Sequence, residues 1–248
     1  GTRFHIHIIC KHEYPPIDLS NYIDDAGHAC TYYPFDEKLT TIFRVSGHAS
    51  PANYYRVFIG HLLPVSIEKV LYLDVDIIVR KRITPLFDKD LDNYVIGAVR
   101  EYEMPATKKI NLGLRAEAPY FNSGVLLINL RAWNKSNLTE RLIEFISRNA
   151  ELMEFWDQDA LNALLVDQWM ELPLSYNYQT GYCVSGVLLK DPHVVHYTGK
   201  SKPWYYMDKH PHKREYYKYI KYTPWKNFTP EDATVGNFLR KHGLMPKF

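Results

Sequence analysis

Two aspartates, Asp74 and Asp76, interrupt the apolar stretch "KVLYLDVDIIV" at residues 69–79 and stand one residue apart. Residues i and i+2 of an extended chain point to the same side, so an extended backbone would bring the two carboxylates together. Like charges at close range repel each other, and a divalent cation relieves the repulsion. Oxygen ligands suit magnesium, manganese or calcium better than zinc. The structural alternative is that one aspartate caps a turn and the other is a solvated strand end.

A third candidate ligand lies more than a hundred residues further along the chain. His196 follows the apolar segment "PHVVHY", so it is expected at a strand end, where a neutral imidazole can complete a metal site with two carboxylates. In the continuation "HYTGKSKPW", Gly199 lets backbone amides approach a phosphate and Lys202 offers a point charge for a diphosphate. Taken alone, the histidine and the lysine are read as a structural residue and an ordinary surface residue.

Polar side chains that can hold a sugar occur in three further segments. Arg56 in "YYRVFIGHLLP" offers a bidentate cation, and Asn122 in "YFNSG" offers a donor and acceptors to hydroxyl groups. In "WDQDALN", Asp157 is expected as a helix cap, and a carboxylate there also accepts hydrogen bonds from sugar hydroxyls. Each of the three has a structural alternative, namely a core-edge arginine, a turn asparagine and a simple helix cap.

These residues fall on an alternation of predicted strands and helices. The apolar runs "RFHIHIIC", "KVLYLDVD", "YVIGAVRE" and "GVLLINL" predict strands. Helices are predicted between them, in "SPANYYRVFIGHLLP", "SNLTERLIEFISRNAEL" and "DQDALNALL". This alternation predicts an α/β fold with a largely parallel sheet. Ligands of such sheets collect beyond the carboxyl ends of the strands, which is where Asp74 and Asp76 fall.

The ends of two predicted helices are marked by capping residues. Ser50 is a plausible N-cap before Pro51, and the helix that follows is expected to end at Pro64. Near the C-terminus, Thr229 and Pro230 with the acids that follow predict the cap and first turn of a last helix.

Taken together and in this order, "YYRVFIGHLLP..IEKVLYLDVDIIV", "YFNSGVLLINLRAW", "FWDQDALNALL" and "HYTGKSKPW" closely resemble the retaining glycosyltransferases of family eight. That family includes bacterial lipopolysaccharide galactosyl- and glucosyltransferases and, more distantly, glycogenin. The resemblance runs from about Ser50 to Trp204. It implies the GT-A nucleotide-diphospho-sugar transferase fold, which is Rossmann-like with a mixed, mostly parallel sheet. It also implies a UDP-hexose donor and a manganese ion, with magnesium as the alternative metal.

The resemblance also implies a role for each candidate residue. The metal ligands are Asp74, Asp76 and His196. The donor-binding residues are Arg56, Asp74, Asp76, Asn122, Asp157, Gln158, Gly199 and Lys202. The catalytic residues are Asp157, Gln158 and Asp159, with Gln158 near the anomeric carbon and Asp159 as a reserve nucleophile or supporting residue. A neutral amide is a poor nucleophile, so same-face substitution is predicted, in which the leaving UDP helps to deprotonate the acceptor hydroxyl.

The two ends of the chain differ from the central segments. Family members normally begin with a strand and an Asp-containing turn that hold the uracil and ribose, and "RFHIHIIC" corresponds to the next strand. Residues 1–203 are therefore predicted as a GT-A catalytic domain without that first strand. Residues 204–248 are predicted as a helical extension rich in aromatic and basic residues. The extension either packs its tyrosines on the domain or contacts anionic membrane or lipopolysaccharide headgroups.

Composition narrows the class of protein. Lys plus Arg exceed Asp plus Glu by only 30 to 28, which gives no reason to expect a nucleic-acid partner. No apolar run approaches the roughly 20 residues that span a bilayer. The three cysteines are scattered, which argues against a disulfide framework and favours a reducing compartment. A cytoplasmic location is predicted, with peripheral contact to the inner membrane of a bacterium.

The leading hypothesis is a metal-dependent retaining hexosyltransferase that moves galactose or glucose from a UDP-sugar to a saccharide acceptor, lipopolysaccharide or another surface glycan. A non-catalytic sugar- or nucleotide-binding module of the same fold is a second hypothesis, and UDP binding without turnover would favour it. A third is a sugar nucleotidyltransferase, which release of pyrophosphate from UTP and sugar phosphate would reveal. The sequence does not distinguish glucose from galactose and does not identify the acceptor.

Overall fold

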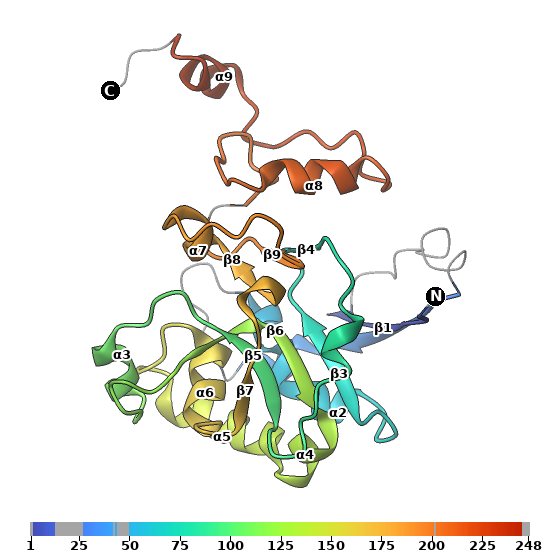
Figure 1. The fold of residues 1–248 in the computed structure, drawn as a ribbon, viewed down its shortest axis with the longest axis vertical. Helices are drawn as coiled ribbons and strands as arrows, with labels where there is room; N and C mark the ends of the chain where they lie inside the picture. The colour runs from blue at the N-terminus through green and yellow to red at the C-terminus, as the bar shows by residue number, and fades with distance from the viewer. Residues whose placement is uncertain (1, 13–26, 42, 44–49, 201, 245–248) are drawn as a thin grey trace. The chain divides into compact units, whose positions relative to one another are not determined.

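The structure is a computed structural model that describes residues 2–12, 27–41, 43, 50–200 and 202–244 (Figure 1). The chain folds into two compact units. Gly1–Tyr72, Thr84–Ala98 and Met104–Met170 form the first unit, and Leu73–Ile83, Val99–Glu103 and Glu171–Phe248 form the second. The predicted boundary after residue 203 stays a prediction, since residues on both sides of it belong to the second unit.

The strands of the described residues form three sheets. In the first unit, β1 (His5–Lys11) and β2 (Ala29–Phe35) pair in parallel. A four-stranded sheet has the order β3 (Lys69–Leu73), β6 (Phe121–Asn129), β5 (Ile96–Arg100) and β7 (Trp169–Glu171). In the second unit, β9 (Val194–His196) pairs antiparallel with β4 (Ile77–Val79) and parallel with β8 (Tyr178–Gln179). The predicted α/β class is confirmed, with mixed strands divided among three sheets rather than gathered in one.

The division of the sheets has a local cause at the two aspartates. The apolar stretch "KVLYLDVDIIV" contains two strands, because β3 ends at Leu73 and β4 begins at Ile77. Val75 and Asp76 form a turn between them, with the Val75 side chain fully exposed. The expectation of an extended backbone at these residues was therefore wrong, and β4 joins a different sheet from β3.

Helices of the first unit follow the predicted apolar patterns. The helix after Ser50 is confirmed as η3 (Pro51–Phe58), a 3-10 helix, continued by α2 (Ile59–Leu62). Leu138, Leu142 and Ile146 of α5 (Leu138–Asn149) are fully buried, as the period of the sequence predicts. The other helical segments of this unit are η2 (Glu37–Thr40), η4 (Thr84–Leu86), α3 (Ala106–Asn111), α4 (Leu130–Lys135) and α6 (Trp156–Leu164).

The core of the first unit gathers around β6, which is buried at every position except its last residue. Leu126 and Ile128 of β6 belong to one hydrophobic cluster with Trp133 of α4 and Leu161 of α6. The polar residues at the start of this strand, Asn122 and Ser123, are buried with it. Burial of a near-continuous apolar run is what the sequence "GVLLINL" predicts.

In the second unit, the helical segments are η5 (Leu174–Tyr176), α7 (Thr180–Val184), α8 (Lys213–Ile220) and α9 (Val235–Lys241). The predicted cap of the last helix at Thr229 was wrong. Thr234 is the N-cap, and its side chain accepts a hydrogen bond from Asn237 N. Asp232 was expected in the first turn of this helix. It instead lies before the helix and accepts hydrogen bonds from the backbone N–H groups of Tyr206 and Met207. Within the described ranges, no helix has the length and apolar character needed to cross a membrane.

Candidate functional site

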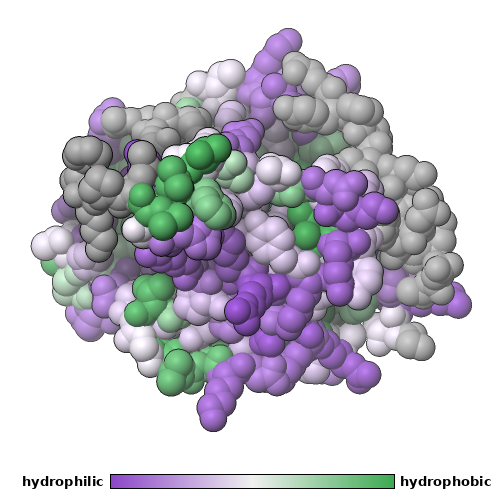
Figure 2. Space-filling view, turned by 90° about the horizontal axis from the view of Figure 1, so that it is seen from above, coloured by the Kyte–Doolittle hydropathy of each residue, from purple (hydrophilic) through white to green (hydrophobic). Residues whose placement is uncertain are grey.

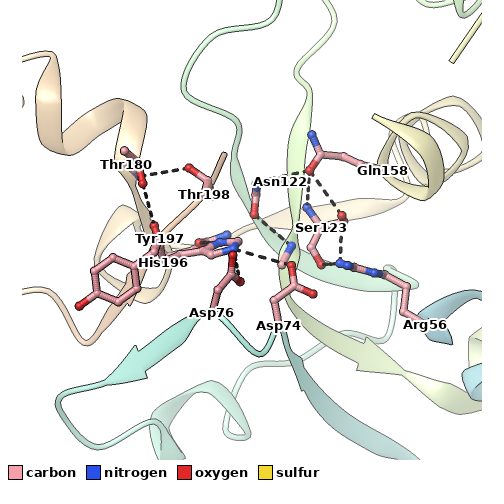
Figure 3. Close-up of polar contacts among 12 residues, drawn as sticks. Arg56, Asp74, Asp76, Asn122, Ser123, Gln158, Thr180, His196, Tyr197 and Thr198 are labelled. Carbon is pink, nitrogen blue, oxygen red and sulfur yellow. Dashed lines mark hydrogen bonds and ion pairs between the residues drawn. The ribbon is translucent and has the colours of Figure 1, made fainter. Parts of the chain in front are cut away.

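The predicted metal ligands meet in the second unit (Figure 3). Asp74 follows β3 directly and Asp76 lies in the turn before β4, while His196 ends β9. Antiparallel pairing of β4 with β9 places Ile77 opposite His196, and Tyr197 N donates to Asp76 O over 3.0 Å. The pairing of the short β4 strand with β9 therefore places His196 beside the two aspartates, although it lies more than a hundred residues away in the sequence.

The ligand atoms of these three residues fit a divalent cation. His196 Nε2 lies 3.2 Å from Asp76 Oδ1 and 3.7 Å from Asp74 Oδ2. One atom from each side chain can be chosen so that all lie within 4.8 Å of one another. His196 is buried, and its Nδ1 donates to Asn177 Oδ1 over 2.9 Å, which directs Nε2 at the carboxylates, where it could bind a cation. Two carboxylate oxygens and one imidazole nitrogen are a donor set for manganese or magnesium.

Lys202 stands next to this cluster. Its ammonium group donates to Asp76 Oδ2 over 2.5 Å and to the carbonyl oxygen of Tyr197 over 2.6 Å. Burial tends to raise the pKa of Asp76, but a hydrogen bond from His196 and the charges of His196 and Lys202 outweigh it and lower that pKa. Asp76 is therefore held as a carboxylate, the form that binds a metal ion. Anions that approach the cluster would meet the ammonium group of Lys202.

Gly199 lies between His196 and Lys202 and has a φ of +78°. A side chain is disfavoured in this left-handed conformation, although a Cβ atom would meet no neighbour within 4 Å. The backbone conformation, rather than lack of room, therefore requires glycine here. It lets the chain turn back so that Lys202 reaches Asp76.

The remaining predicted residues meet in the first unit. Arg56 of η3 is buried, and its Nε lies 2.9 Å from Asp157 Oδ2 of α6. Its Nη1 donates to the carbonyl oxygen and, over 3.0 Å, to the hydroxyl of Ser123. The guanidinium also lies 4.6 Å from the ring centroid of Tyr72. Arg56 therefore joins η3, β3, β6 and α6, and a buried ion pair with further hydrogen bonds is the form in which such charges are tolerated.

Gln158 is positioned by the start of β6. Its Oε1 accepts hydrogen bonds from Ser123 N over 3.0 Å and from Asn122 Nδ2 over 3.2 Å. Asn122 Oδ1 in turn accepts from Gly124 N. All three side chains of Asn122, Ser123 and Gln158 are buried. The amide of Gln158 is thus oriented with its oxygen toward β6, which turns its Nε2 donor to the opposite side.

Asp159, rather than Asp157, organises the start of α6. The helix begins at Trp156, and Asp157 lies within its first turn, so the predicted cap at Asp157 was wrong. Arg56 draws Asp157 into the buried network, whereas Asp159 Oδ2 accepts from Glu154 N and Phe155 N over 2.7 Å each. Asp159 Oδ1 accepts from Tyr120 Oη over 2.5 Å. These contacts give Asp159 a supporting geometry, and its role as a reserve nucleophile stays a prediction.

Two residues were missed by the sequence reasoning. Asn177, which orients His196, is fully buried but stands in "LSYNYQT", where no pattern separates it from a loop asparagine. Tyr120 precedes the "FNSG" segment and reads as one more apolar position before a strand. A buried polar residue with a fixed partner is visible only once the partner is placed.

The fold and the polar network define a class. An α/β protein that brings two carboxylates, an imidazole and a lysine together has a donor set that could hold a metal ion. Comparison with known proteins identifies the family within that class. The model of glycosyl transferase family 8 matches residues 3–208, and the chain belongs to this family. Members of the family are retaining hexosyltransferases that use UDP-sugar donors.

Named relatives agree with this assignment. The chain is 35% identical over 208 residues to general stress protein A of Bacillus subtilis, covering 77% of this chain and 70% of that protein. It is 30% identical to lipopolysaccharide 1,2-glucosyltransferase of Escherichia coli, covering 74% of this chain and 58% of that enzyme. The crystal structure of galactosyltransferase LgtC with donor and acceptor sugar analogues superposes with a TM-score of 0.77 at 21% identity, covering 93% and 98% of the two chains. That likeness confirms the GT-A type of fold.

Proposed function

We propose that this chain is a metal-dependent retaining hexosyltransferase that transfers galactose or glucose from a UDP-sugar to a saccharide acceptor, lipopolysaccharide or another surface glycan. The observation that carries the proposal is the cluster of Asp74, Asp76 and His196 with Lys202 on Asp76. A donor set of this kind beside a lysine suits a sugar diphosphate, whose charge it neutralises. The relatives include a glucosyltransferase and a galactosyltransferase, which supports a hexose without deciding between the two.

The residues have distinct parts in the proposed reaction. Asp74, Asp76 and His196 would hold the cation. The cation is proposed to be manganese, with magnesium as the alternative. When bound, it would neutralise charge on the diphosphate. Lys202 exchanges its contact with Asp76 for a phosphate oxygen, and Gly199 lets backbone N–H groups approach the same anion. These contacts stabilise the negative charge that develops on the leaving UDP.

The second group of residues is proposed to bind the donor sugar. Arg56, Asn122, Asp157 and Gln158 offer charged and amide groups of the kind that bind hydroxyls. Gln158 is proposed to lie near the anomeric carbon, where its Nε2 donates a hydrogen bond. The network within the first unit, from Arg56 to Asp157 and from Ser123 to Gln158, holds these groups before a sugar binds. Such preorganisation lowers the entropy cost of the reaction.

Same-face substitution is proposed because Gln158, the residue proposed to lie near the anomeric carbon, is a poor nucleophile. The bond between the anomeric carbon and the β-phosphate oxygen breaks, and the acceptor oxygen forms its bond on the same face. The acceptor proton passes to an oxygen of the departing UDP, so atoms and charge balance without a covalent enzyme intermediate. Retention of configuration is the expected outcome. The reaction is proposed to occur in the cytoplasm, with the acceptor presented at the inner face of a membrane.

A donor panel tests the proposal. UDP-glucose, UDP-galactose and their N-acetyl forms are incubated with the chain, with manganese and with chelator, and UDP release is followed with saccharide acceptors and with water alone. Release with one UDP-hexose that requires metal supports the proposal. UDP binding without release would favour a binding module, and pyrophosphate from UTP and sugar phosphate would favour a nucleotidyltransferase. Either result would overturn the assignment.

A further inference from the structure

A groove along α8, in the second unit, has no part in the reaction proposed above. Its cavity volume is about 540 Å³, within the range of roughly 300–1,000 Å³ typical of small-molecule sites. Its basic lining residues are Lys209, His210, Lys213, Arg214, Lys218 and Lys221. No carboxylate occurs among the described residues that line it. The face of the molecule seen from above in Figure 2 carries many hydrophilic side chains, with hydrophobic ones grouped beside them.

Some of the cationic side chains of the groove already contact other protein groups, and others do not contact a carboxylate. Lys213 donates to the carbonyl oxygens of Tyr205, Tyr206 and Asp208, so it supports the local chain. Lys218 pairs with Glu215 over 2.7 Å. Lys209 and Arg214 are exposed, and neither has a carboxylate partner in the described part of the chain. A strongly positive groove therefore retains cations available to an anion.

His210 adds an uncharged donor to this groove. Its side chain is buried, with 6% exposure, and packs edge-on against the Tyr197 ring at 4.7 Å between centroids. Nδ1 accepts a hydrogen bond from His212 N over 3.1 Å, so the ring proton of the neutral form lies on Nε2. Nε2 is buried and meets no hydrogen-bond partner among the described residues. Buried N–H groups without an acceptor are rare in native proteins, and an oxygen of a bound ligand would satisfy this one.

We infer that the α8 groove binds a phosphate group carried by the saccharide acceptor. This inference rests on the proposed transferase function and names its acceptor class. The planar guanidinium of Arg214 suits two phosphate oxygens, Lys209 and Lys221 add point charges, and His210 Nε2 donates to a further oxygen. His210 contacts Tyr197, the neighbour of His196 in sequence, so the groove and the metal ligands share one unit. A phosphate held here would anchor an acceptor to the unit that holds the donor's diphosphate.

A single phosphate group explains the groove better than an anionic bilayer surface does. A bilayer meets side chains that protrude, such as exposed lysines and aromatic rings. His210 Nε2 is buried, so a flat headgroup layer would leave it without an acceptor. A phosphate that enters the hollow meets the surrounding cations and lies beside the His210 ring, which also lines the hollow.

Binding is tested on the full chain without a donor and with EDTA, so that the metal site does not retain the probe. Glucose 6-phosphate is titrated by calorimetry, with glucose as the neutral control. Glucose 6-phosphate is expected to bind and glucose is not. Arg214→Gln should weaken binding by at least about tenfold, because it removes a charge-assisted contact. Lys226→Gln is the matched control, since Lys226 is an exposed cation of the same region that does not line the groove.

A second measurement observes His210 directly. Long-range proton–nitrogen spectra of histidine-labelled protein should show the Nε2–H signal of His210 shift on addition of glucose 6-phosphate, and Arg214→Gln should suppress that shift. Equal affinity in Arg214→Gln and the original chain, or an unmoved His210 signal at saturation, would overturn the inference. So would Arg214-dependent binding to phosphatidylglycerol vesicles without any binding of glucose 6-phosphate.

Activity assays separate this inference from the proposed function. Transfer to a phosphorylated saccharide acceptor and to the same acceptor after phosphatase treatment is compared, while UDP release to water reports on the donor site. The phosphorylated acceptor should have the lower KM, and Arg214→Gln should remove that difference. Equal KM values for both acceptors would contradict the inference alone. Lack of UDP release from every donor would contradict the proposed function, and the binding experiments would still decide about the groove.

Discussion

The imidazole of His196 donates its Nδ1 proton to the side-chain oxygen of Asn177 over 2.9 Å. Because an amide oxygen only accepts hydrogen bonds, this contact places a proton on Nδ1 and directs Nε2 toward Asp74 and Asp76. Asn177 is fully buried and follows η5, so the ring is oriented by the fold and not by the metal alone.

Replacing Asn177 should weaken the metal site while leaving the three ligands in place. Asn177→Ala is expected to lower manganese affinity by about 10–100-fold, the usual effect of losing a partner that orients a ligand. Manganese titration followed by electron paramagnetic resonance measures it. Thermal unfolding in EDTA serves as the control for folding. Unchanged affinity in a folded variant would show that Asn177 does not orient His196.

Removing one carboxylate should abolish metal-dependent transfer. Asp76→Asn keeps the size of the side chain but removes the charge that binds the cation and pairs with Lys202. Transfer is expected to fall to the level seen with chelator, and the far-ultraviolet circular dichroism spectrum should stay unchanged. Asp88→Asn, at an exposed acid, is the matched control. An Asp76→Asn variant with full activity would remove the central claim of the proposed function.

The buried pair of Arg56 and Asp157 should show strong energetic coupling. Arg56→Met leaves the buried Asp157 charge without the guanidinium that pairs with it, which costs about 3–5 kcal/mol of the free energy of unfolding. The double variant Arg56→Met/Asp157→Leu removes both charges and should lose much less than the sum of the single variants. Urea unfolding measures all four proteins of the cycle. Additive losses would mean that the ion pair makes no net contribution.

Replacing Gln158 should lower the turnover rate. Gln158→Ala removes the proposed donor to the sugar and leaves the buried Ser123 N–H without its acceptor. A loss of kcat on the order of 100-fold is expected, together with about 1–3 kcal/mol of stability. UDP release and urea unfolding are measured, with exposed Gln168→Ala as the matched control. Normal kcat in Gln158→Ala would place the sugar elsewhere.

His210 should make stability depend on pH. Burial lowers the pKa of His210 to about 4 from its ordinary value of 6.5, so the unfolded chain binds a proton more readily between these values. Stability from this residue is therefore complete above pH 6.5 and is lost as pH falls toward 4, by on the order of 3 kcal/mol. Urea unfolding at several pH values measures the slope. His210→Asn should flatten it, and His12→Asn, at an exposed histidine, should not; equal slopes in all three proteins would contradict the assignment.

The grouping of the candidate metal ligands could be predicted, because it depends on residue types in short local motifs. Asp74 and Asp76 with His196 were predicted as ligands from two local motifs, and the structure brings their ligand atoms within 4.8 Å of one another. The strands at β1, β5 and β6 and the buried face of α5 follow from apolar periodicity. Periodicity is a local property, so the sequence determines it without knowledge of the partner elements.

The contacts between distant segments were decided only by the tertiary structure. Asp74 follows β3 and Asp76 lies in a turn, so the two do not share one extended strand, because β4 leaves the sheet of β3 to pair with β9. Asp157 was expected to cap α6 but instead forms an ion pair with Arg56, and Asp159 accepts the hydrogen bonds at the start of the helix. In each case a strand or a charged side chain has more than one possible partner. Which partner it pairs with depends on which one the fold brings near, and the linear sequence does not contain that distance.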